Sequence, residues 1–175
     1  FIDAIDGKTL PAADGVQALS PEVSYVMANM MESVTTTGTG AKVGATLKIP
    51  IAGKTGTSND ARDCWFIGMT PDYTIGVWVG YDDTRPMPGE QGARVAAPIF
   101  TDILEQWKQP AKEFVRPPHV VDATIDKVTG LLAPDGAPKD TTLDEVFVEG
   151  TQPTGTAPKP GEATESSSVT GEYGD

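Results

Sequence analysis

The chain of 175 residues is poor in the side chains on which many catalytic and metal sites depend. It has a single cysteine, Cys64, and a single histidine, His119, which excludes an internal disulfide and a metal site built from several such ligands. His119 lies in a proline-containing stretch, where we interpret it as a linker residue and not as part of a Ser-His-Asp arrangement. We therefore expect neither a metal nor a cofactor.

Basic residues and long apolar runs are also scarce. The 13 lysines and arginines stand against 25 acidic residues, and the net charge of −12 disfavours binding to nucleic acid or to an anionic membrane surface. No apolar run approaches the roughly 18 residues of a membrane-spanning helix. The chain begins with Phe1 inside sequence typical of a folded domain, so we expect a fragment whose targeting segment lies upstream.

Composition divides the chain into three parts. Residues 1–112 carry most of the apolar periodicity, and residues 113–150 form a small extension with a few short apolar segments predicted as strands. Residues 151–175 consist mostly of Pro, Gly, Ser and Thr. They cannot bury enough apolar surface to offset the entropy cost of ordering, so a disordered tail is predicted.

Two helices are predicted in the first part. Ser20-Pro21-Glu22 is a helix start, with a capping hydroxyl, a proline at the first position and an early carboxylate. Helical spacing after it predicts one core-facing side, formed by Val23, Val26, Met27, Met30, Met31 and Val34. A second helix is predicted to start at Ala97-Pro98, to run to Trp107 and to cover a sheet. Its apolar face is formed by Ile99, Phe100, Ile103, Leu104 and Trp107. The glycine-rich segment 37–40 is interpreted as a surface loop and not as a phosphate cradle, because no helix start was found after it.

Three segments, at 49–57, 64–69 and 74–81, predict an antiparallel meander. Pro50 has no N–H to donate, so the first strand should lie at a sheet edge or begin after Pro50. In the second strand the apolar residues occupy both faces, as in a sheet covered on both sides. The fold class expected is therefore α+β, an antiparallel sheet covered by helices.

The first of these strands ends in Lys54, Thr55, Gly56 and Thr57. One ammonium and two hydroxyls around a residue without a Cβ can bind a carboxylate, while the strand edge pairs with an extended peptide. Gly53-Lys54-Thr55 is not a nucleotide-binding P-loop, because the first glycine of that motif would fall at Lys48 and a strand follows instead of a helix.

The surrounding motifs resemble a known family. Ala52-Gly-Lys-Thr-Gly-Thr57, Asp63-x-Trp-Phe-Ile-Gly-x-Thr-Pro71 and Val77-Trp-Val-Gly-Tyr-Asp-Asp83 together look like the C-terminal part of the transpeptidase domain of class A, bifunctional penicillin-binding proteins. The resemblance covers roughly residues 1–150. It implies a partial serine β-lactamase/penicillin-binding transpeptidase fold. Cys64 stands where the family usually has alanine, and we attach no reactivity to it.

The resemblance implies D,D-transpeptidation through a serine acyl-enzyme, with peptidoglycan stem peptides and β-lactams as partners. Lys54 would be the catalytic residue of this segment, supplying positive charge for the substrate carboxylate and for proton relay. Thr55 and Thr57 would bind that carboxylate, and Gly56 would let the peptide approach the strand. The backbone N–H of Thr57 would form half of an oxyanion hole.

Two boxes of the family are missing. No serine has a lysine three residues later, and there is no Ser-x-Asn. We therefore expect the nucleophile and its base upstream, in a parent with a glycosyltransferase domain and an inner-membrane anchor that places this part in the periplasm. The isolated chain is predicted to be inactive. Two alternatives stay open: a β-lactamase or D,D-carboxypeptidase of the same superfamily, or a non-catalytic peptide-binding module.

Overall fold

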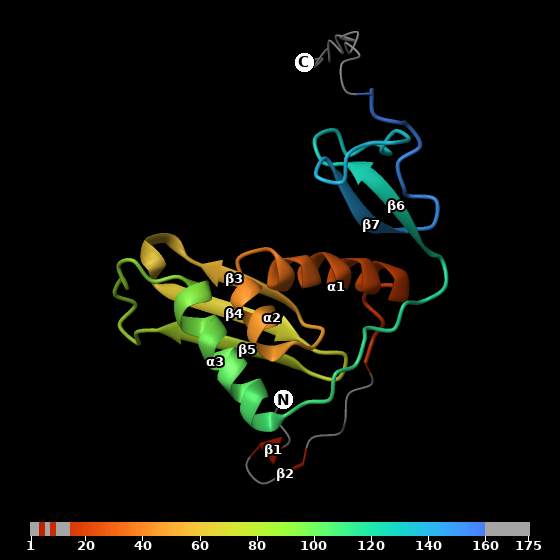
Figure 1. The fold of residues 1–175 in the computed structure, drawn as a ribbon. Coiled ribbons are helices and arrows are strands. Elements are labelled where there is room, and N and C mark those ends of the chain that lie inside the picture. The colour runs from red at the N-terminus through yellow and green to blue at the C-terminus, as the bar shows by residue number, and fades with distance from the viewer. Residues whose placement is uncertain (1–3, 6–7, 10–14, 160–175) are drawn as a thin grey trace, which may run out of the picture.

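A computed structural model describes residues 4–5, 8–9 and 15–159 of the chain (Figure 1). Its main body combines a three-stranded sheet with three helices, and among the described residues one two-stranded sheet precedes this body and another follows it. The helices are α1 (Pro21–Thr36), α2 (Ala41–Leu47) and α3 (Gly92–Trp107). The strands are β1 (Ala4–Ile5), β2 (Lys8–Thr9), β3 (Ala52–Thr57), β4 (Asp63–Met69), β5 (Thr74–Gly80), β6 (Val120–Asp126) and β7 (Thr142–Val148).

The main sheet is the predicted antiparallel meander, in the order β3-β4-β5. Phe66 pairs with Thr55 of β3 on one side and with Val77 of β5 on the other. Short turns set this register: the Ser58 N–H donates to Asp63 O, and the Thr70 N–H donates to Tyr73 O. Among the described residues β3 has a strand neighbour on one side alone, so the prediction of an edge strand is confirmed.

The core lies on one face of this sheet, beneath α3. The rings of Phe66 in β4 and Phe100 in α3 are fully buried and meet edge to face, with centroids 4.9 Å apart. Leu104 of α3 and Val43 of α2 join the same cluster. Fully burying side chains of this size contributes about 1.5–3 kcal/mol each, so this contact fixes the helix on the sheet.

Helix α3 differs from the prediction at its start and in its buried side. It begins at Gly92, and Pro98, which was interpreted as a start signal, lies inside it. Phe100 is buried as predicted, whereas Ile99 and Ile103 are exposed by 43% and 39%. The buried side of the helix is formed by Phe100 and Leu104 together with small residues such as Ala96. The predicted apolar side therefore included residues that do not contact the sheet.

Helix α1 begins where the sequence predicts. The Ser20 hydroxyl accepts a hydrogen bond from the Val23 N–H at 3.3 Å. At the other end, Thr35 is buried and its hydroxyl donates to Ile51 O, which joins the last turn of α1 to the segment that enters β3.

The apolar side of α1 was expected to face the core, and for three of its residues this prediction is wrong. Val23, Met27 and Met30 are exposed by 40%, 47% and 54%. The helix contacts β3, α2 and β7, and these contacts leave the three side chains partly in solvent.

The second face of the main sheet is also open in the part of the chain that the structure describes. Trp65, Ile67 and Trp78 lie on it and are each 43% exposed. The expectation of a sheet covered on both sides is therefore not met by the described elements. Figure 1 shows α2 and α3 together on one side of the strands.

Helix α2 was not predicted. It follows Gly40 directly, without a side-chain hydrogen bond at its start. Its stability comes from tertiary packing, since Val43 is 2% exposed in the core cluster. The reason given for interpreting residues 37–40 as an isolated surface loop was therefore wrong.

The small sheet pairs β6 with β7, and Leu132 adds two isolated bridges, an antiparallel one to Ile125 and a parallel one to Thr156. The predicted tail is partly folded here. The Leu132 N–H donates to Gly155 O, the Ala157 N–H donates to Leu132 O, and Ala157 is 5% exposed. Residues 160–175 of that tail lie outside the described residues. No helix in the described ranges is long and apolar enough to cross a membrane.

Candidate functional site

The segment Lys54–Thr57 forms the end of edge strand β3. Because the Ser58 N–H donates to Asp63 O, the alternation of an antiparallel ladder directs the backbone of Gly56 and Lys54 toward β4. The N–H and C=O groups of Thr55 and Thr57 therefore point away from β4, toward the free edge. These are the groups that an extended peptide needs for pairing.

The side chains of this segment lie on opposite faces of the strand. Lys54 is exposed and shares its face with its cross-strand partner Ile67, and its Nζ donates to Thr55 O at 2.8 Å. Thr55 and Thr57 are directed to the face that the helices cover. The ammonium thus reaches the free edge from one face, and the two hydroxyls line the other.

Both threonine hydroxyls have a hydrogen-bond partner in another element of the fold. Thr55 Oγ1 lies 2.8 Å from Oγ1 of Thr39, in the loop between α1 and α2. Thr57 Oγ1 accepts a hydrogen bond from the backbone N–H of Gly92, the first residue of α3, at 3.1 Å. The sequence analysis missed both Thr39 and Gly92. The sequence shows that Thr39 lies between two glycines, which indicates a tight turn but does not link that turn to Thr55.

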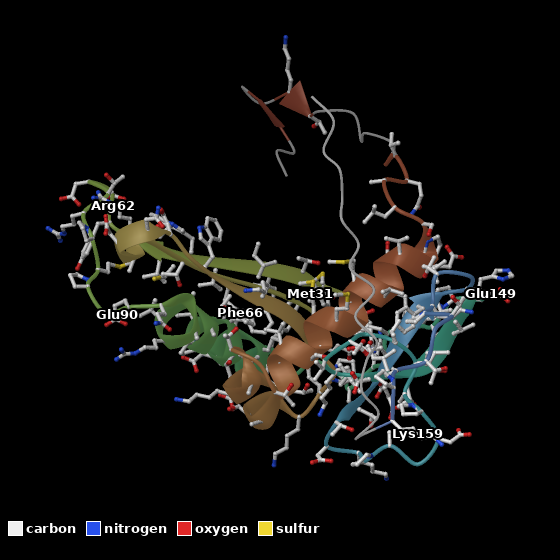
Figure 2. All side chains as sticks on the ribbon, turned by 90° about the horizontal axis from the view of Figure 1, so that it is seen from above. Met31, Arg62, Phe66, Glu90, Glu149 and Lys159 are labelled. Atoms are coloured by element: carbon white, nitrogen blue, oxygen red, sulfur yellow. The ribbon has the colours of Figure 1, made fainter. Side chains whose placement is uncertain are left out.

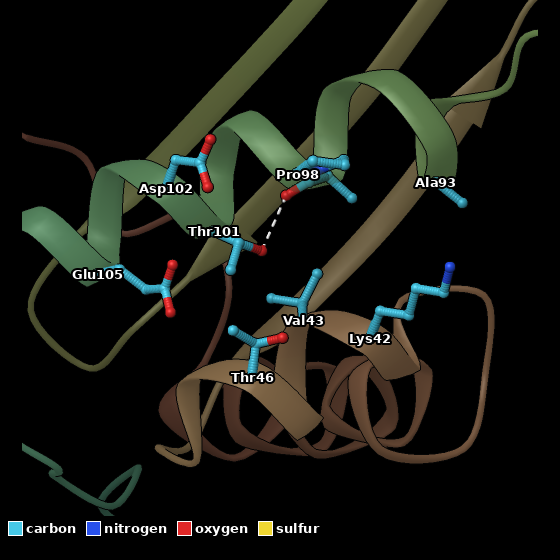
Figure 3. A pocket seen from close by; sticks show the side chains of 9 residues that line it. Lys42, Val43, Thr46, Ala93, Pro98, Thr101, Asp102 and Glu105 are labelled. Carbon is cyan, nitrogen blue, oxygen red and sulfur yellow. Dashed lines mark hydrogen bonds between the residues drawn. The ribbon is translucent and has the colours of Figure 1, made fainter.

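Three hollows lie near these elements in the described part of the chain, and Thr39 lines one of them, of about 480 Å³. The other two differ in whether they contain a predicted site residue. One, of about 240 Å³, lies between α2 and α3 with Lys42 at one end and Asp102 and Glu105 at the other (Figure 3). It contains none of the predicted site residues. The second, of about 480 Å³, lies at the end of β3 and is lined by Thr57.

The second hollow lies between the short helical turn after β3 and the loop that leads to α3. Its lining includes Ala61, Pro86 and Glu90. Figure 2 shows Arg62 and Glu90 at this same end of the sheet, far from Glu149 of the small sheet. Space is therefore available beside the last residue of the Lys-Thr-Gly-Thr segment.

The remaining titratable candidates lie outside this arrangement. Cys64 is fully buried, and burial raises the pKa of its thiol, so it is a poor nucleophile. His119 forms an ion pair with Glu149 at 2.7 Å at the exposed end of the small sheet. Asp82 and Asp83 are exposed beyond the end of β5.

The comparisons with known proteins cover both parts of the chain. A profile described as the penicillin binding protein transpeptidase domain matches residues 1–105, and one described as the penicillin-binding protein 1A C-terminal domain matches residues 116–162.

Curated relatives carry the same description. Penicillin-binding protein 1A of Clostridium botulinum is 33% identical over 85% of this chain and 19% of its own length. The proteins of that name from Pseudomonas aeruginosa and Escherichia coli are 37% and 33% identical, over 69% and 84% of this chain and 15% and 20% of their own lengths. The chain thus spans a fifth or less of the length of these relatives.

A solved structure is similar as well. The crystal structure of penicillin-binding protein 1A from Haemophilus influenzae superposes with a TM-score of 0.68 at 29% identity, covering 79% of this chain and 22% of that one.

Proposed function

Because the chain belongs to the penicillin-binding protein transpeptidase family, we propose that it is the substrate-binding, C-terminal part of a class A peptidoglycan D,D-transpeptidase. One observation carries the proposal: Lys54-Thr55-Gly56-Thr57 ends an edge strand that pairs with β4 on one side and has no strand partner on the other among the described residues. The cross-linking activity belongs to the longer protein, to which this chain contributes the strand.

The strand binds the C-terminus of a stem peptide in extended form. The peptide pairs with the outward N–H and C=O groups of Thr55 and Thr57, and Gly56 keeps the strand surface free of a Cβ. The terminal carboxylate lies at the free edge, where it meets the Lys54 ammonium from one face and the two hydroxyls from the other. Hydrogen bonds to such a charged acceptor are stronger than those between neutral groups.

The chemistry is acyl transfer. A serine from chain outside this segment attacks the carbonyl carbon of the penultimate D-Ala, the peptide bond breaks, and the last D-Ala leaves with a proton on its amine. The Thr57 N–H stabilises the oxyanion formed in this step. The amine of a second stem peptide then attacks the ester, which forms the cross-link and restores the serine hydroxyl.

The longer protein supplies what this chain lacks. The sequence has no Ser-x-x-Lys and no Ser-x-Asn, and the matched part of the chain spans a fifth or less of the curated relatives' lengths. The open face that carries Trp65, Ile67 and Trp78 gives further chain an apolar surface to cover. We place the membrane anchor and the glycosyltransferase domain in that further chain, with this part in the periplasm.

Within this chain we assign residues 1–112 to the transpeptidase domain and residues 113–150 to a small C-terminal extension. The exposed polar loops of the small sheet suit an appendage that does not contact the substrate strand.

Labelling with a fluorescent penicillin tests the proposal. The parent polypeptide is expected to form a covalent adduct, and the isolated 175-residue chain to form none. In the parent, Lys54→Ala is expected to slow adduct formation about 100-fold, the usual effect of removing one oxyanion- or carboxylate-stabilising group. Lys112→Ala, which removes an exposed lysine paired with Asp72, is the matched control and should label normally.

Two results would count against the proposal. Covalent labelling of the isolated chain would place the nucleophile within it. Rapid hydrolysis of the adduct by the parent would indicate a β-lactamase instead.

A further inference from the structure

The two hydroxyls at the end of β3 are each hydrogen-bonded to a residue of another element. The partner of Thr57 Oγ1 is the N–H of Gly92 at 3.1 Å, and the partner of Thr55 Oγ1 is the hydroxyl of Thr39 at 2.8 Å. These partners come from two different elements, the start of α3 and the loop between α1 and α2.

A threonine hydroxyl has one hydrogen to donate and two lone pairs that accept. A backbone N–H can only donate, so the Gly92 bond occupies a lone pair of Thr57 and leaves the hydroxyl hydrogen of Thr57 available for another acceptor. A carboxylate has no hydrogen at neutral pH and bonds to Thr55 only if Thr55 donates. With a carboxylate bound, the bond between the two threonines must therefore be donated by Thr39.

The loop that carries Thr39 is built to hold it in place. A Cβ added to Gly38 would lie 2.8 Å from Val34 Cα, and one added to Gly40 would lie 3.3 Å from Val34 O. Glycine at both positions lets the chain turn tightly against the end of α1. The Gly40 N–H donates to Val34 O, and the buried hydroxyl of Thr35 ties this end of α1 to Ile51 O, next to β3.

We propose that Thr39 is a positioning residue that donates to Thr55 and so orients the Thr55 hydroxyl as a donor toward the substrate carboxylate, as the Gly92 N–H does for Thr57. Thr39 acts through Thr55 and does not itself bond to the reacting atoms. This inference rests on the proposed function, because it assumes that Thr55 binds a carboxylate.

The test uses the parent polypeptide and a pair of β-lactams, a penicillin with its free carboxylate and the neutral methyl ester of the same compound. Thr39→Val keeps the shape of the side chain and removes the hydroxyl. It is expected to lower the second-order acylation rate about tenfold for the carboxylate form and less than about twofold for the ester, because one hydrogen bond that supports a charged contact is lost. Thr39→Ser, which keeps the hydroxyl, should stay within about twofold of the native rate.

The carboxylate-to-ester ratio separates positioning from a structural role. An equal loss with both compounds in Thr39→Val, or no loss with either, would overturn the proposal. The double variant Thr39→Val/Thr55→Val gives a second measurement: the combined loss should equal that of Thr55→Val alone, and additive losses would also overturn it.

Failure of the proposed function has a different signature. If Thr55→Val leaves the carboxylate-to-ester ratio at its native value, then Thr55 does not bind the carboxylate, whatever Thr39 does.

Discussion

His119 and Glu149 are joined at one end of the small sheet by a side-chain contact and a backbone hydrogen bond. His119 Nδ1 lies 2.7 Å from Glu149 Oε2, and the His119 backbone carbonyl accepts from the Glu149 N–H at 2.8 Å. The hydrogen bond and the negative charge of Glu149 raise the pKa of His119 above its ordinary value of 6.5. The sequence analysis interpreted this sole histidine as a linker residue. Its two bonds to Glu149 attach that linker to the end of the small sheet.

A raised pKa in the folded state has a defined consequence for pH dependence. The protonated imidazolium is favoured by folding, so its stabilising contribution is fully present below about pH 6.5 and is lost as the pH rises through the folded-state pKa. An NMR titration should give a His119 midpoint above 6.5, and Glu149→Gln should return it toward 6.5. Asp122→Asn, which breaks the nearby pair with Arg116, is the control and should leave the midpoint unchanged. The same midpoint in Glu149→Gln would contradict the assignment.

At the scale of elements, close contact between α3 and the sheet depends on a glycine in β4. A Cβ added to Gly68 would lie 2.5 Å from two ring atoms of Phe100 and 2.9 Å from Phe66. Gly76 of β5, which pairs with Ile67, faces the open side of the sheet, where the nearest atom to an added Cβ is 3.9 Å away in Ile67. The two glycines therefore form a matched pair for testing whether α3 packs in direct contact with β4.

Gly68→Ala is expected to destabilise the fold by about 1–3 kcal/mol through overpacking of the two rings. Gly76→Ala should be neutral or slightly stabilising, since alanine costs less backbone entropy than glycine. Urea unfolding of the two variants and the native chain measures the difference. Equal effects at both positions would mean that α3 does not press on β4 as described.

Elements with short-range signals could be predicted from the sequence, and elements held by tertiary packing could not. The cap at Ser20 and the turns around β4 depend on local chemistry, and α1 and the meander were found. Helix α2 has no side-chain cap, and the buried Val43 holds it. The start of α3 was missed because Pro98 imitates a first-turn proline.

The candidate site shows the same division. Lys54, Thr55, Gly56 and Thr57 could be named from the sequence because they are adjacent in it. Thr39 and Gly92 could not be assigned to the site, because they are distant in the chain and only folding brings them to the two hydroxyls.

At the scale of the whole molecule, the described part of the chain has one covered and one open side. Trp65, Ile67 and Trp78 on the sheet are 43% exposed, and Met27 and Met30 on α1 are 47% and 54% exposed. If further chain of the parent covers this face of the sheet, Trp65, Ile67 and Trp78 are exposed in the isolated segment and buried in the parent.

Cysteine labelling can measure that change. Ile67→Cys places a thiol on the open face, and Val128→Cys places one in an exposed loop of the small sheet, where the native side chain is 91% exposed. Native Cys64 is buried and serves as an internal reference. With a neutral maleimide, the thiol at position 67 should react about tenfold more slowly in the parent than in the isolated chain, because reactivity follows access. The thiol at 128 should react equally in both, and equal rates at 67 would show that the open face stays uncovered.

The position of Gly92 allows the loop before α3 to affect the end of β3. An added Cβ at Gly92 would meet Trp65 O and lie 2.6 Å from Gly56 O, so the first residue of the helix rests directly on the backbone of β3 and β4. The same residue supplies the N–H that Thr57 accepts. If β3 binds the substrate as proposed, changes in residues 84–91 that shift this helix start would alter ligand binding without contacting the ligand, and a search for sensitive positions confined to the strand itself would overlook them.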